Sequence, residues 1–243
     1  MKSKIKYIQS LSQKKLREEE GVFVAEGPKI VEELLQASNV KAKQLFGTRQ
    51  WIQENEQWKP LFQQNSIEVQ EDELKQVSFL QTPNQVVGIF YQPVFGPLQI
   101  SGRVSLMLDA IQDPGNVGTI IRCADWFGVE QIICSNECAD VFSPKVIQST
   151  MGSISRVQVV YEDLLSFITR HASIPVYAAT LNGVDISEHA TIKEGVILIG
   201  NESKGIRPEL LSKVNHLITI RGKGNAESLN AAIATGIILS HLV

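Results

Sequence analysis

Short apolar runs alternate along this chain with longer segments in which apolar residues recur at helical spacing. The apolar runs that predict strands lie at 22–25, 44–46, 86–90, 104–108, 131–134, 176–179, 196–199 and 217–220. Helical segments are predicted from Pro28 to Leu35 and at 117–127, 164–170 and 228–242. In the second part of the chain the strands are almost entirely apolar, which indicates a parallel sheet covered by helices on both faces. The fold class is therefore α/β.

A change in pattern divides the chain in two. Tyr91 to Leu98 includes Pro93, Gly96 and Pro97, and is the best linker candidate in the sequence. It predicts a smaller α/β domain at 1–92, a linker at 93–103 and a larger α/β domain at 104–243.

The amino-acid composition limits the class of protein but does not indicate a function. The 243 residues carry a net charge of −3, with 43% hydrophobic and 20% charged residues, as is usual for globular proteins. Collagen, a disordered tail and a disulfide-stapled miniprotein are excluded. No apolar run is long enough for a transmembrane helix, and the N-terminus lacks the apolar core of a signal peptide. An odd number of cysteines, three, suits a reducing compartment, so we expect a cytoplasmic protein.

Two of the cysteines, Cys134 and Cys138, have a spacing that raises the question of a metal site. Cys134 ends an apolar run, and no second pair of cysteines or histidines has zinc spacing. We therefore expect packed thiols and assign no metal.

The first 17 residues contain six basic side chains and no acidic one. These are Lys2, Lys4, Lys6, Lys14, Lys15 and Arg17, and Glu18, Glu19 and Glu20 follow directly. A solvated amphipathic helix and a segment that contacts nucleic-acid phosphates both explain this pattern, and the two hypotheses stay open. The overall acidity argues only against coating of nucleic acid by bulk charge.

Parallel sheets bind ligands beyond the carboxyl ends of their strands, so the loops after Leu108, Ala179, Ile199 and Ile220 are the places to look. After Leu108, a turn of Pro114, Gly115 and Asn116 leads into the helix that holds Arg122. An arginine among apolar helix residues is costly unless it is paired or lines a site. An ion pair with Asp109, Asp113 or Asp125 is the structural alternative.

The two later loops are rich in glycine. Gly200, directly after a strand, allows close approach of a ligand, although a plain strand-to-helix connection has the same composition. The segment Gly222-Lys223-Gly224 is not a nucleotide P-loop, and no G-x-G-x-x-G follows the first strand, so a dehydrogenase has little support. Ser228 is expected to cap the last helix, which would leave Asn230 as a buried polar group.

Three segments together resemble one protein family. They are Asp109-x3-Asp113-Pro-x-Asn116-x-Gly118-x3-Arg122, Gly200-Asn-Glu202-x-x-Gly205 and Glu227-Ser-Leu-Asn230 before a helix of small residues. Their order and spacing resemble the SpoU/TrmH group of RNA ribose 2′-O-methyltransferases, within the SPOUT class. Residues 5–35 more weakly resemble the accessory substrate-binding domain of that group, which implies an L30e-like domain.

The resemblance implies a deep trefoil knot, a homodimer with the knot helices at its interface, and S-adenosylmethionine as cofactor. The residues it implies for cofactor binding are Thr180, Leu181, Gly200, Asn201, Gly205, Ile220 and Leu229. The N-terminal residues implied for RNA binding are Lys4, Lys6, Lys14, Lys15 and Arg17. The family usually has a proline where this chain has Arg221, so the cofactor contact of that loop stays an open question.

For catalysis the resemblance implies Arg122, Asn116, Glu202, Ser228 and Asn230. Arg122 would activate the ribose hydroxyl, although a guanidinium keeps its proton in proteins, which favours a charge-stabilising role over that of a literal base. Asn116 would hold the ribose or Arg122. Glu202 would orient the second loop, and Ser228 and Asn230 would line the pocket.

The implied substrate is structured RNA, with ribosomal RNA ahead of transfer RNA because a chain with the accessory domain resembles the ribosomal branch. One alternative is a catalytically silent RNA-binding homologue, and another is an unrelated nucleotide-binding α/β enzyme. A knot methyltransferase that acts on a base is disfavoured by the motif set.

Overall fold

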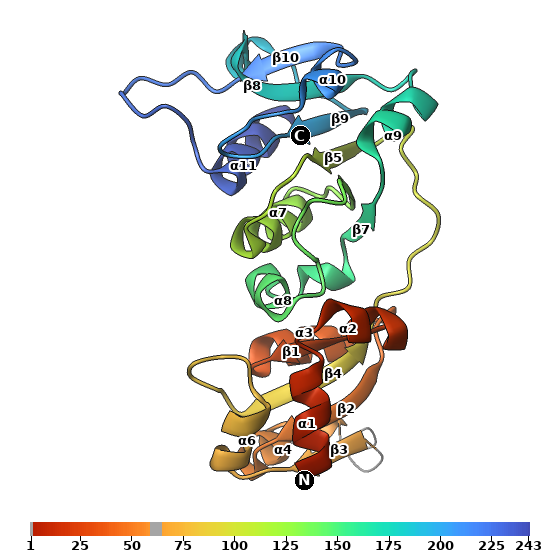
Figure 1. Cartoon of the computed structure of the whole chain (residues 1–243), viewed down its shortest axis with the longest axis vertical. Helices are drawn as coiled ribbons and strands as arrows, with labels where there is room; N and C mark the ends of the chain where they lie inside the picture. Colours follow the sequence, from red (N-terminus) through yellow and green to blue (C-terminus); the bar gives the residue numbers. More distant parts are fainter. Residues whose placement is uncertain (1, 59–64) are drawn as a thin grey trace. The chain divides into compact units, whose positions relative to one another are not determined.

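The computed structural model describes residues 2–58 and 65–243, which form two compact units (Figure 1). Unit 1 comprises Met1–Phe95 and Phe142–Ser155, and unit 2 comprises Gly96–Val141 and Arg156–Val243. The units are therefore not continuous in sequence. No helix among the described residues is long and apolar enough to cross a membrane.

Unit 1 is built on a mixed four-stranded sheet in the order β1-β4-β2-β3. Its strands are β1 (Val22–Glu26), β2 (Ala42–Gly47), β3 (Ser66–Glu68) and β4 (Val86–Tyr91). Its helices are α1 (Lys2–Ser10), α2 (Lys14–Glu20), α3 (Pro28–Gln36), α4 (Arg49–Glu54), α6 (Glu71–Val77) and α8 (Pro144–Thr150), with 3-10 turns at Glu56–Trp58 and Ser153–Ser155. The chain pairs β4 antiparallel with both β1 and β2, and β2 parallel with β3.

The apolar pattern explains most of this unit. β1, β2, β4 and α3 form where predicted, and Pro28 opens α3. The short elements β3, α4, α6 and α8 were not predicted, because segments of three to seven residues carry too little periodicity. The segment Phe142–Ser155 packs on unit 1 through the ring of Phe142, 5.6 Å from that of Phe23, and through a hydrogen bond from Asn39 Nδ2 to the Ser155 carbonyl.

Unit 2 contains a fully parallel six-stranded sheet in the order β10-β8-β9-β5-β6-β7. The apolar runs predicted a parallel sheet and five of its strands, but missed the strand at Gln158–Tyr161, which is four residues long and only half-buried. The strands are β5 (Val104–Leu108), β6 (Gln131–Cys134), β7 (Gln158–Tyr161), β8 (Val176–Asp185), β9 (Gly195–Ile199) and β10 (His216–Thr219). The helices are α7 (Pro114–Trp126), α9 (Leu164–Arg170), α10 (Pro208–Leu211) and α11 (Ala231–Leu242), with a 3-10 turn at Ile186–Glu188.

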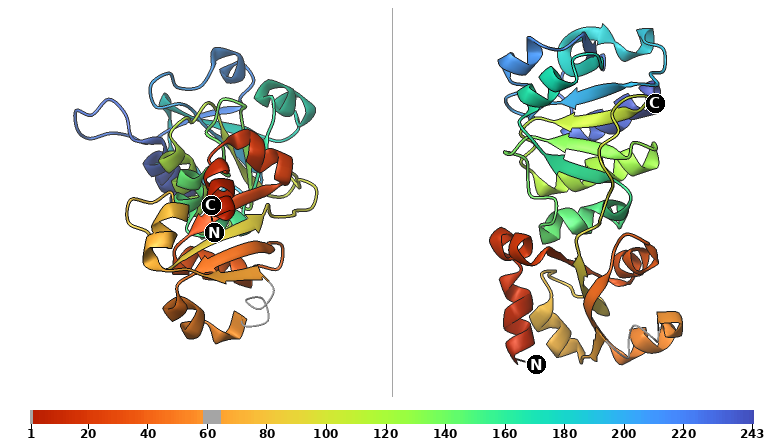
Figure 2. Two further views of the ribbon diagram at one scale, coloured as in Figure 1. Left: turned by 60° about the horizontal axis from the view of Figure 1, so that its bottom comes forward. Right: turned by 90° about the vertical axis from the view of Figure 1, so that its right-hand side faces the viewer.

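Helices lie on both faces of this sheet (Figure 2). α7 and α11 pack together, and α9 contacts α10. One core cluster joins alternate strand residues such as Met107, Ile133 and Leu198 to Phe167 of α9 and Leu210 of α10. The strand period of two leaves the remaining apolar strand residues for the opposite face.

Two predicted helix starts in unit 2 were wrong by three residues. α7 begins at Pro114 rather than at Val117, because the Asp113 side chain accepts a hydrogen bond from the Asn116 N–H and caps the helix. α11 begins at Ala231 rather than at Ser228, because Asn230 is the cap. The Asn230 Oδ1 atom accepts from the N–H groups of Ala232 and Ile233, so Asn230 is an exposed cap and not the buried polar group that was expected.

Candidate active site

The strand order of unit 2 reverses between β5 and β9. From β5 the chain proceeds through β6 to β7 on one side, and then β8, β9 and β10 fill the other side. In open parallel sheets such a reversal separates the loops at the carboxyl edge and creates a ligand crevice. The loops 109–113 after β5 and 200–207 after β9 flank this point, and both contain motif residues.

Asn116 joins three loops that are distant in sequence. Its Nδ2 group donates to Glu202 Oε1, from the loop after β9. Its Oδ1 atom accepts a hydrogen bond of 2.9 Å from Nδ2 of Asn230, at the start of α11. The structure therefore brings together three of the five predicted catalytic residues.

The loop after β9 closes on itself through two glycines. A Cβ atom at Gly200 would lie 2.5 Å from the carbonyl carbon of Gly205, so the position requires glycine. Gly205 has φ +68, in the left-handed region. Asn201 and Gly205 exchange backbone hydrogen bonds of 3.1 and 2.8 Å, which holds Glu202 at the tip of a tight turn.

The two predicted residues of β8 lie where the sheet is interrupted. The pairing of β8 with β10 jumps from Ala178 to Val184, so residues 179–183 leave the regular ladder. Thr180 and Leu181 lie in this excursion, and the Leu181 carbonyl accepts a hydrogen bond from Thr219 Oγ1. Thr180 Oγ1 is buried and has no hydrogen-bond partner among the described residues. A buried hydroxyl without a partner is uncommon, and at the ligand-binding edge of a sheet it is a candidate contact for a bound group.

The segment 221–230 extends away from the sheet between β10 and α11 (Figure 1, blue), and all its side chains are exposed. Asn230, at the end of this segment, bonds Asn116, whereas Ser228 and Leu229 form no hydrogen bond with it in the described part of the chain. Ile220 directly follows β10 and is half-buried. Arg221, where the family usually has proline, forms an ion pair of 3.5 Å with Asp185 at the end of β8.

Arg122 does not occupy the environment expected for it. Its side chain is exposed on α7 and has no hydrogen bond or ion pair within the described part of the chain. The expected ion pairs are not formed: Asp109 pairs with Arg207 and Asp125 with Arg156. The apolar neighbours of Arg122 in sequence point elsewhere, because only every third or fourth residue of a helix shares a face. Trp126, 82% exposed, lies one turn further along the same face.

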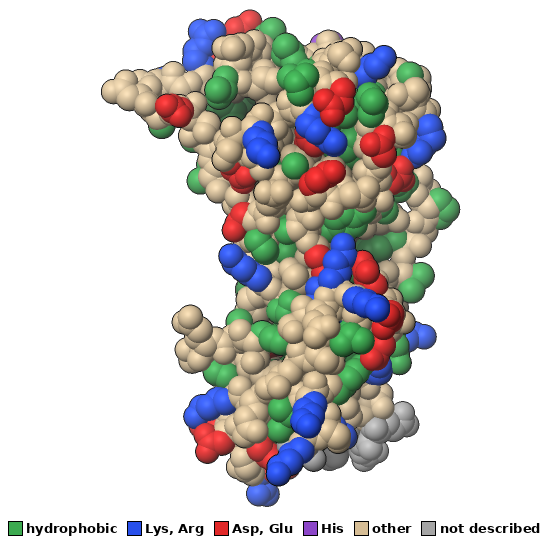
Figure 3. Space-filling view, viewed as in Figure 1, with side chains coloured by type: hydrophobic (Ala, Val, Ile, Leu, Met, Phe, Trp, Pro, Cys, Tyr) green, Lys and Arg blue, Asp and Glu red, His purple; other side chains and the backbone are tan. Residues whose placement is uncertain are grey.

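The N-terminal cations lie on α1 and α2, as the hypothesis of an exposed helix expected, with one exception. Lys2, Lys4 and Lys6 are exposed on α1. Lys14 and Lys15 are exposed on α2 and form ion pairs of 3.6 and 3.8 Å with Glu18 and Glu19. Positive and negative side chains also lie among each other on the face drawn in Figure 3.

Arg17 is the exception, and its predicted exposure is wrong. It is 3% exposed, and its Nη1 group donates to the carbonyls of Leu11 and Ser12 at 2.6 and 2.8 Å. A guanidinium matches free carbonyls after a helix end, which explains its burial.

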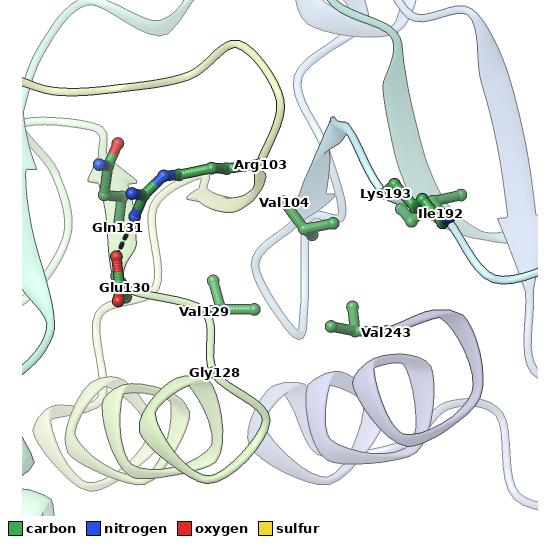
Figure 4. Close-up of a pocket in the computed structure, with 9 residues that line it drawn as sticks. All are labelled: Arg103, Val104, Gly128, Val129, Glu130, Gln131, Ile192, Lys193 and Val243. Carbon is green, nitrogen blue, oxygen red and sulfur yellow. Dashed lines mark hydrogen bonds and ion pairs between the residues drawn. The ribbon is translucent and has the colours of Figure 1, made fainter.

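A cavity of about 470 Å³ lies at the opposite, amino edge of the sheet (Figure 4). Val104, Val129 and Val243 line it, and the ion pair of Arg103 and Glu130 closes one side. None of the predicted site residues lines this cavity.

Cys134 is buried at the carboxyl end of β6, as predicted, and Cys138 is buried near it.

Sequence reasoning missed one pair at the site. Arg207 donates from its N–H and Nε groups to the Asp109 carboxylate, which is 1% exposed. Asp109 was expected as the first residue of a family motif and as a possible partner of Arg122, not of Arg207. The available signals were an acidic residue directly after a buried strand and an arginine just before Pro208, but no spacing rule pairs residues so far apart.

The fold and the site define a class of protein. It is an α/β protein with a parallel sheet that binds its ligand at the carboxyl edge, where polar side chains join the loops. Residues 103–240 match the SpoU rRNA Methylase family, and residues 2–88 match the MRM3-like substrate binding domain. The chain belongs to the SpoU rRNA methylase family.

Similar proteins cover nearly the whole chain. The 23S rRNA (guanosine(2553)-2′-O)-methyltransferase RlmP of Bacillus subtilis is 30% identical, over 98% of this chain and 95% of that protein. An AdoMet-bound rRNA methyltransferase from Sinorhizobium meliloti is 35% identical with a TM-score of 0.86, over 98% of this chain and 93% of that one. A Porphyromonas gingivalis protein assigned to the TrmH family is 35% identical with a TM-score of 0.82, over 98% and 96%.

These similarities confirm the predicted family, the α/β fold with its parallel sheet, and the predicted class of enzyme, an RNA methyltransferase that uses S-adenosylmethionine.

Proposed function

We propose that this enzyme methylates the 2′-hydroxyl of a ribose in ribosomal RNA, and that its site comprises the loops that Asn116 joins. Two hydrogen bonds of Asn116 carry the proposal, one donated to Glu202 and one accepted from Asn230, because they bring all three family motifs together in one unit. The ribosomal substrate is supported by the activities in the names of the Bacillus subtilis and Sinorhizobium meliloti relatives.

The residues present fit S-adenosylmethionine. The buried Thr180 hydroxyl lacks a partner, which a polar group of the cofactor would supply. We assign cofactor contacts to Thr180 and Leu181, to Gly200, Asn201 and Gly205, and to Ile220 and Leu229. When bound, S-adenosylmethionine supplies a methyl group on a positively charged sulfur, which is open to attack by an oxygen nucleophile.

The chain's own residues then have distinct tasks. A ribose hydroxyl is a weak nucleophile, so it needs its proton removed or its developing charge stabilised. Arg122 provides a fixed positive charge for that oxygen or for the adjacent phosphate. Asn116, held between Glu202 and Asn230, positions the ribose, and Glu202 keeps the second loop in place. Ser228 lines the pocket from the segment before α11.

We further propose a homodimer through α7 and α11, together with the trefoil knot of the family. Ile233 and Ile237 on α11 are 56% and 37% exposed, and Trp126 on α7 is 82% exposed. Large apolar side chains gathered on an exposed helix pair are typical of an interface. The dimer also explains why Arg122, on the same face of α7 as Trp126, has no partner within its own chain.

Unit 1 is proposed to bind the RNA, with an L30e-like fold and with Lys4, Lys6, Lys14 and Lys15 as phosphate contacts. The match of residues 2–88 to a substrate-binding domain supports this. The proposed division of the chain remains 1–92, 93–103 and 104–243. A cytoplasmic location is part of the proposal, because three free cysteines suit a reducing compartment.

Ribose-methylation mapping tests the function directly. Ribosomal and transfer RNA from cells with and without the gene are compared for 2′-O-methylation, and the purified enzyme is then given the unmodified RNA with labelled S-adenosylmethionine. We expect one ribosomal nucleotide to lose methylation and the enzyme to restore it. Loss confined to transfer RNA would refute the ribosomal substrate, and no loss with intact RNA binding would identify a silent homologue.

A further inference from the structure

An ion pair between the buried Asp109 and the half-buried Arg207 links the two loops of the proposed site and takes no part in the mechanism above. Asp109 directly follows β5 and is 1% exposed. One of its oxygens accepts from Arg207 Nε at 2.8 Å, and the other accepts from the Arg207 backbone N–H at 2.9 Å. A buried carboxylate is stable only when it is paired and hydrogen-bonded, and Arg207 supplies both requirements.

Other carboxylates also lie near the positive charge of Arg207. Glu209 lies 3.9 Å from its Nε atom. The pKa of Glu137 is lowered mainly by a hydrogen bond with Ser135, and the positive charge of Arg207 contributes. Several carboxylates thus lie near one guanidinium, and the Nε edge of Arg207 is taken up by Asp109 although the side chain is 37% exposed.

The residue after Asp109 shows that this loop is held under constraint. Ala110 has φ +55, a left-handed conformation that costs free energy for any residue with a side chain. Its N–H donates to Ser135 Oγ at 3.0 Å, and its carbonyl accepts from Asn201 Nδ2 at 2.8 Å. Side chains that follow β6 and β9 therefore fix the loop that follows β5.

The proposed catalytic contact lies above these anchors. Asn116 and Glu202 meet at the surface, where a single hydrogen bond is too weak to define the distance between two loops. Asp109 lies at the start of one of these loops and Arg207 at the end of the other. The Asp109–Arg207 pair, together with the bond from Asn201 Nδ2 to the Ala110 carbonyl, can therefore set their separation.

We propose that Asp109 and Arg207 are positioning residues for methyl transfer: their ion pair fixes the loop after β9 against the loop after β5, so that Glu202 meets Asn116. This inference rests on the proposed function. It assigns the pair no contact with RNA or cofactor.

The main test replaces Arg207→Met, which keeps the length of the side chain and removes its charge. The matched control is Arg103→Met, which breaks an ion pair with Glu130 at the other end of the same strand. We expect kcat to fall about 10- to 100-fold in Arg207→Met, the size of effect that a small misplacement of reacting groups produces. The KM for RNA should change little, Arg207→Lys should recover part of kcat, and Arg103→Met should match wild type.

A purely structural role would lower the melting temperature of Arg207→Met and leave kcat at wild-type values below that temperature. Combination with Glu202→Gln separates the two. If Arg207 acts through Glu202, the double variant should be no slower than the slower single variant. Multiplying effects, or an equal loss in Arg103→Met, would overturn the proposal.

Amide hydrogen exchange gives a readout that needs no activity. Arg207→Met should speed exchange at Asn201, Gly205 and Ala110, whereas Arg103→Met should not. Unchanged exchange would refute the positioning role even if the enzyme were active. Faster exchange in a chain that transfers no methyl group would instead count against the proposed function alone.

Discussion

The two units of this enzyme satisfy their buried charges in different ways. In unit 1, Glu26 is 4% exposed and accepts hydrogen bonds from the Ser78 hydroxyl and the Phe79 N–H, while the buried Arg17 donates to carbonyls. In unit 2, the carboxylate of Asp109 is matched by the guanidinium of Arg207. Unit 1 thus uses the charges to cap its own chain turns, whereas unit 2 uses an ion pair to join two loops of the proposed site.

The two units also contain two kinds of charged side chain. Those called tied here form ion pairs or hydrogen bonds inside the protein, and those called free are exposed without such a partner. Arg122 in unit 2, and Lys4 and Lys6 in unit 1, are exposed and form no hydrogen bond or ion pair with the described residues. If tied charges fix the structure and free charges meet the substrate, then removing each kind should have a different effect. The predictions below test that division.

The largest effect is expected from Arg122→Ala. An exposed residue without a partner in its own chain contributes little to folding, so stability and the Kd for S-adenosylmethionine should stay near wild type. Methyl transfer should fall at least 1,000-fold, about 4 kcal/mol of barrier. Single-turnover transfer of a labelled methyl group to ribosomal RNA, with calorimetry for the cofactor, measures both.

Arg170→Ala is the control, because Arg170 is a surface residue of the same unit and is paired with Glu162. It should leave transfer unchanged. If Arg122→Ala keeps activity within about tenfold, roughly 1.4 kcal/mol, its catalytic role is wrong.

The second effect concerns binding by unit 1. Replacing Lys4, Lys6, Lys14 and Lys15 together by Gln should weaken RNA binding and flatten its salt dependence. Each lost phosphate contact reduces the slope of log K against log salt by about 0.7 to 0.9, and the ion pairs of Lys14 and Lys15 with glutamates should make their share smaller. Binding titrations from low to high salt measure the slope, and kcat at saturating RNA should not change.

A charge-matched control replaces Lys29, Lys41, Arg49 and Lys75, which lie elsewhere in unit 1, on α3, before β2, on α4 and on α6. A slope that falls equally in both sets would show that only the total charge matters. A slope that falls in neither would remove the N-terminal cations from the RNA interface.

The sequence predicts the sheet of unit 2 better than it predicts the site. The strands can be recognised in the sequence, because a strand buried on both faces needs an unbroken apolar run, such as Val196 to Ile199. The start of α11 was misplaced by three residues, because Ser228 and Asn230 are both good caps and only the backbone decides between them.

Side-chain environments were the least predictable part. Arg122 and Arg17 were each judged from their sequence neighbours, yet one is exposed and the other is buried. The partner of Asp109 lies 98 positions away and is brought near by the strand order alone. Contacts of this kind depend on topology, which local patterns do not encode.

The third effect concerns an uncharged group of the proposed site, the hydroxyl of Thr180. Thr180→Val removes the buried hydroxyl that has no partner and keeps the shape of the side chain. The Kd for S-adenosylmethionine should rise about 3- to 10-fold, as expected for one lost hydrogen bond of about 1 kcal/mol. Ser105→Ala is the matched control, since Ser105 Oγ is also buried without a partner but lies within β5. An equal rise in both variants would remove Thr180 from the cofactor site.

The smallest effect returns to the two buried carboxylates. Burial raises the pKa of Glu26, and the hydrogen bonds from Ser78 and Phe79 only partly offset it. A raised carboxyl pKa stabilises the fold below the ordinary carboxyl pKa, and this contribution is lost as the pH rises through the raised pKa. Glu26→Gln is neutral throughout, so it should match wild type in acid and gain on it toward neutral pH, by about 1 kcal/mol or less because the amide keeps only part of the hydrogen bonding.

Urea unfolding of wild type and Glu26→Gln between pH 4 and 8 measures this difference in the free energy of unfolding. Its expected size is that of one hydrogen bond, about 1 kcal/mol. Asp109→Asn is the counterpart, because it removes the charge that Arg207 requires. It should be less stable than wild type at neutral pH and should also lose activity. If Glu26→Gln lost stability at neutral pH as Asp109→Asn does, both carboxylates would be held as charged groups, and the contrast between capping in unit 1 and pairing in unit 2 would fail.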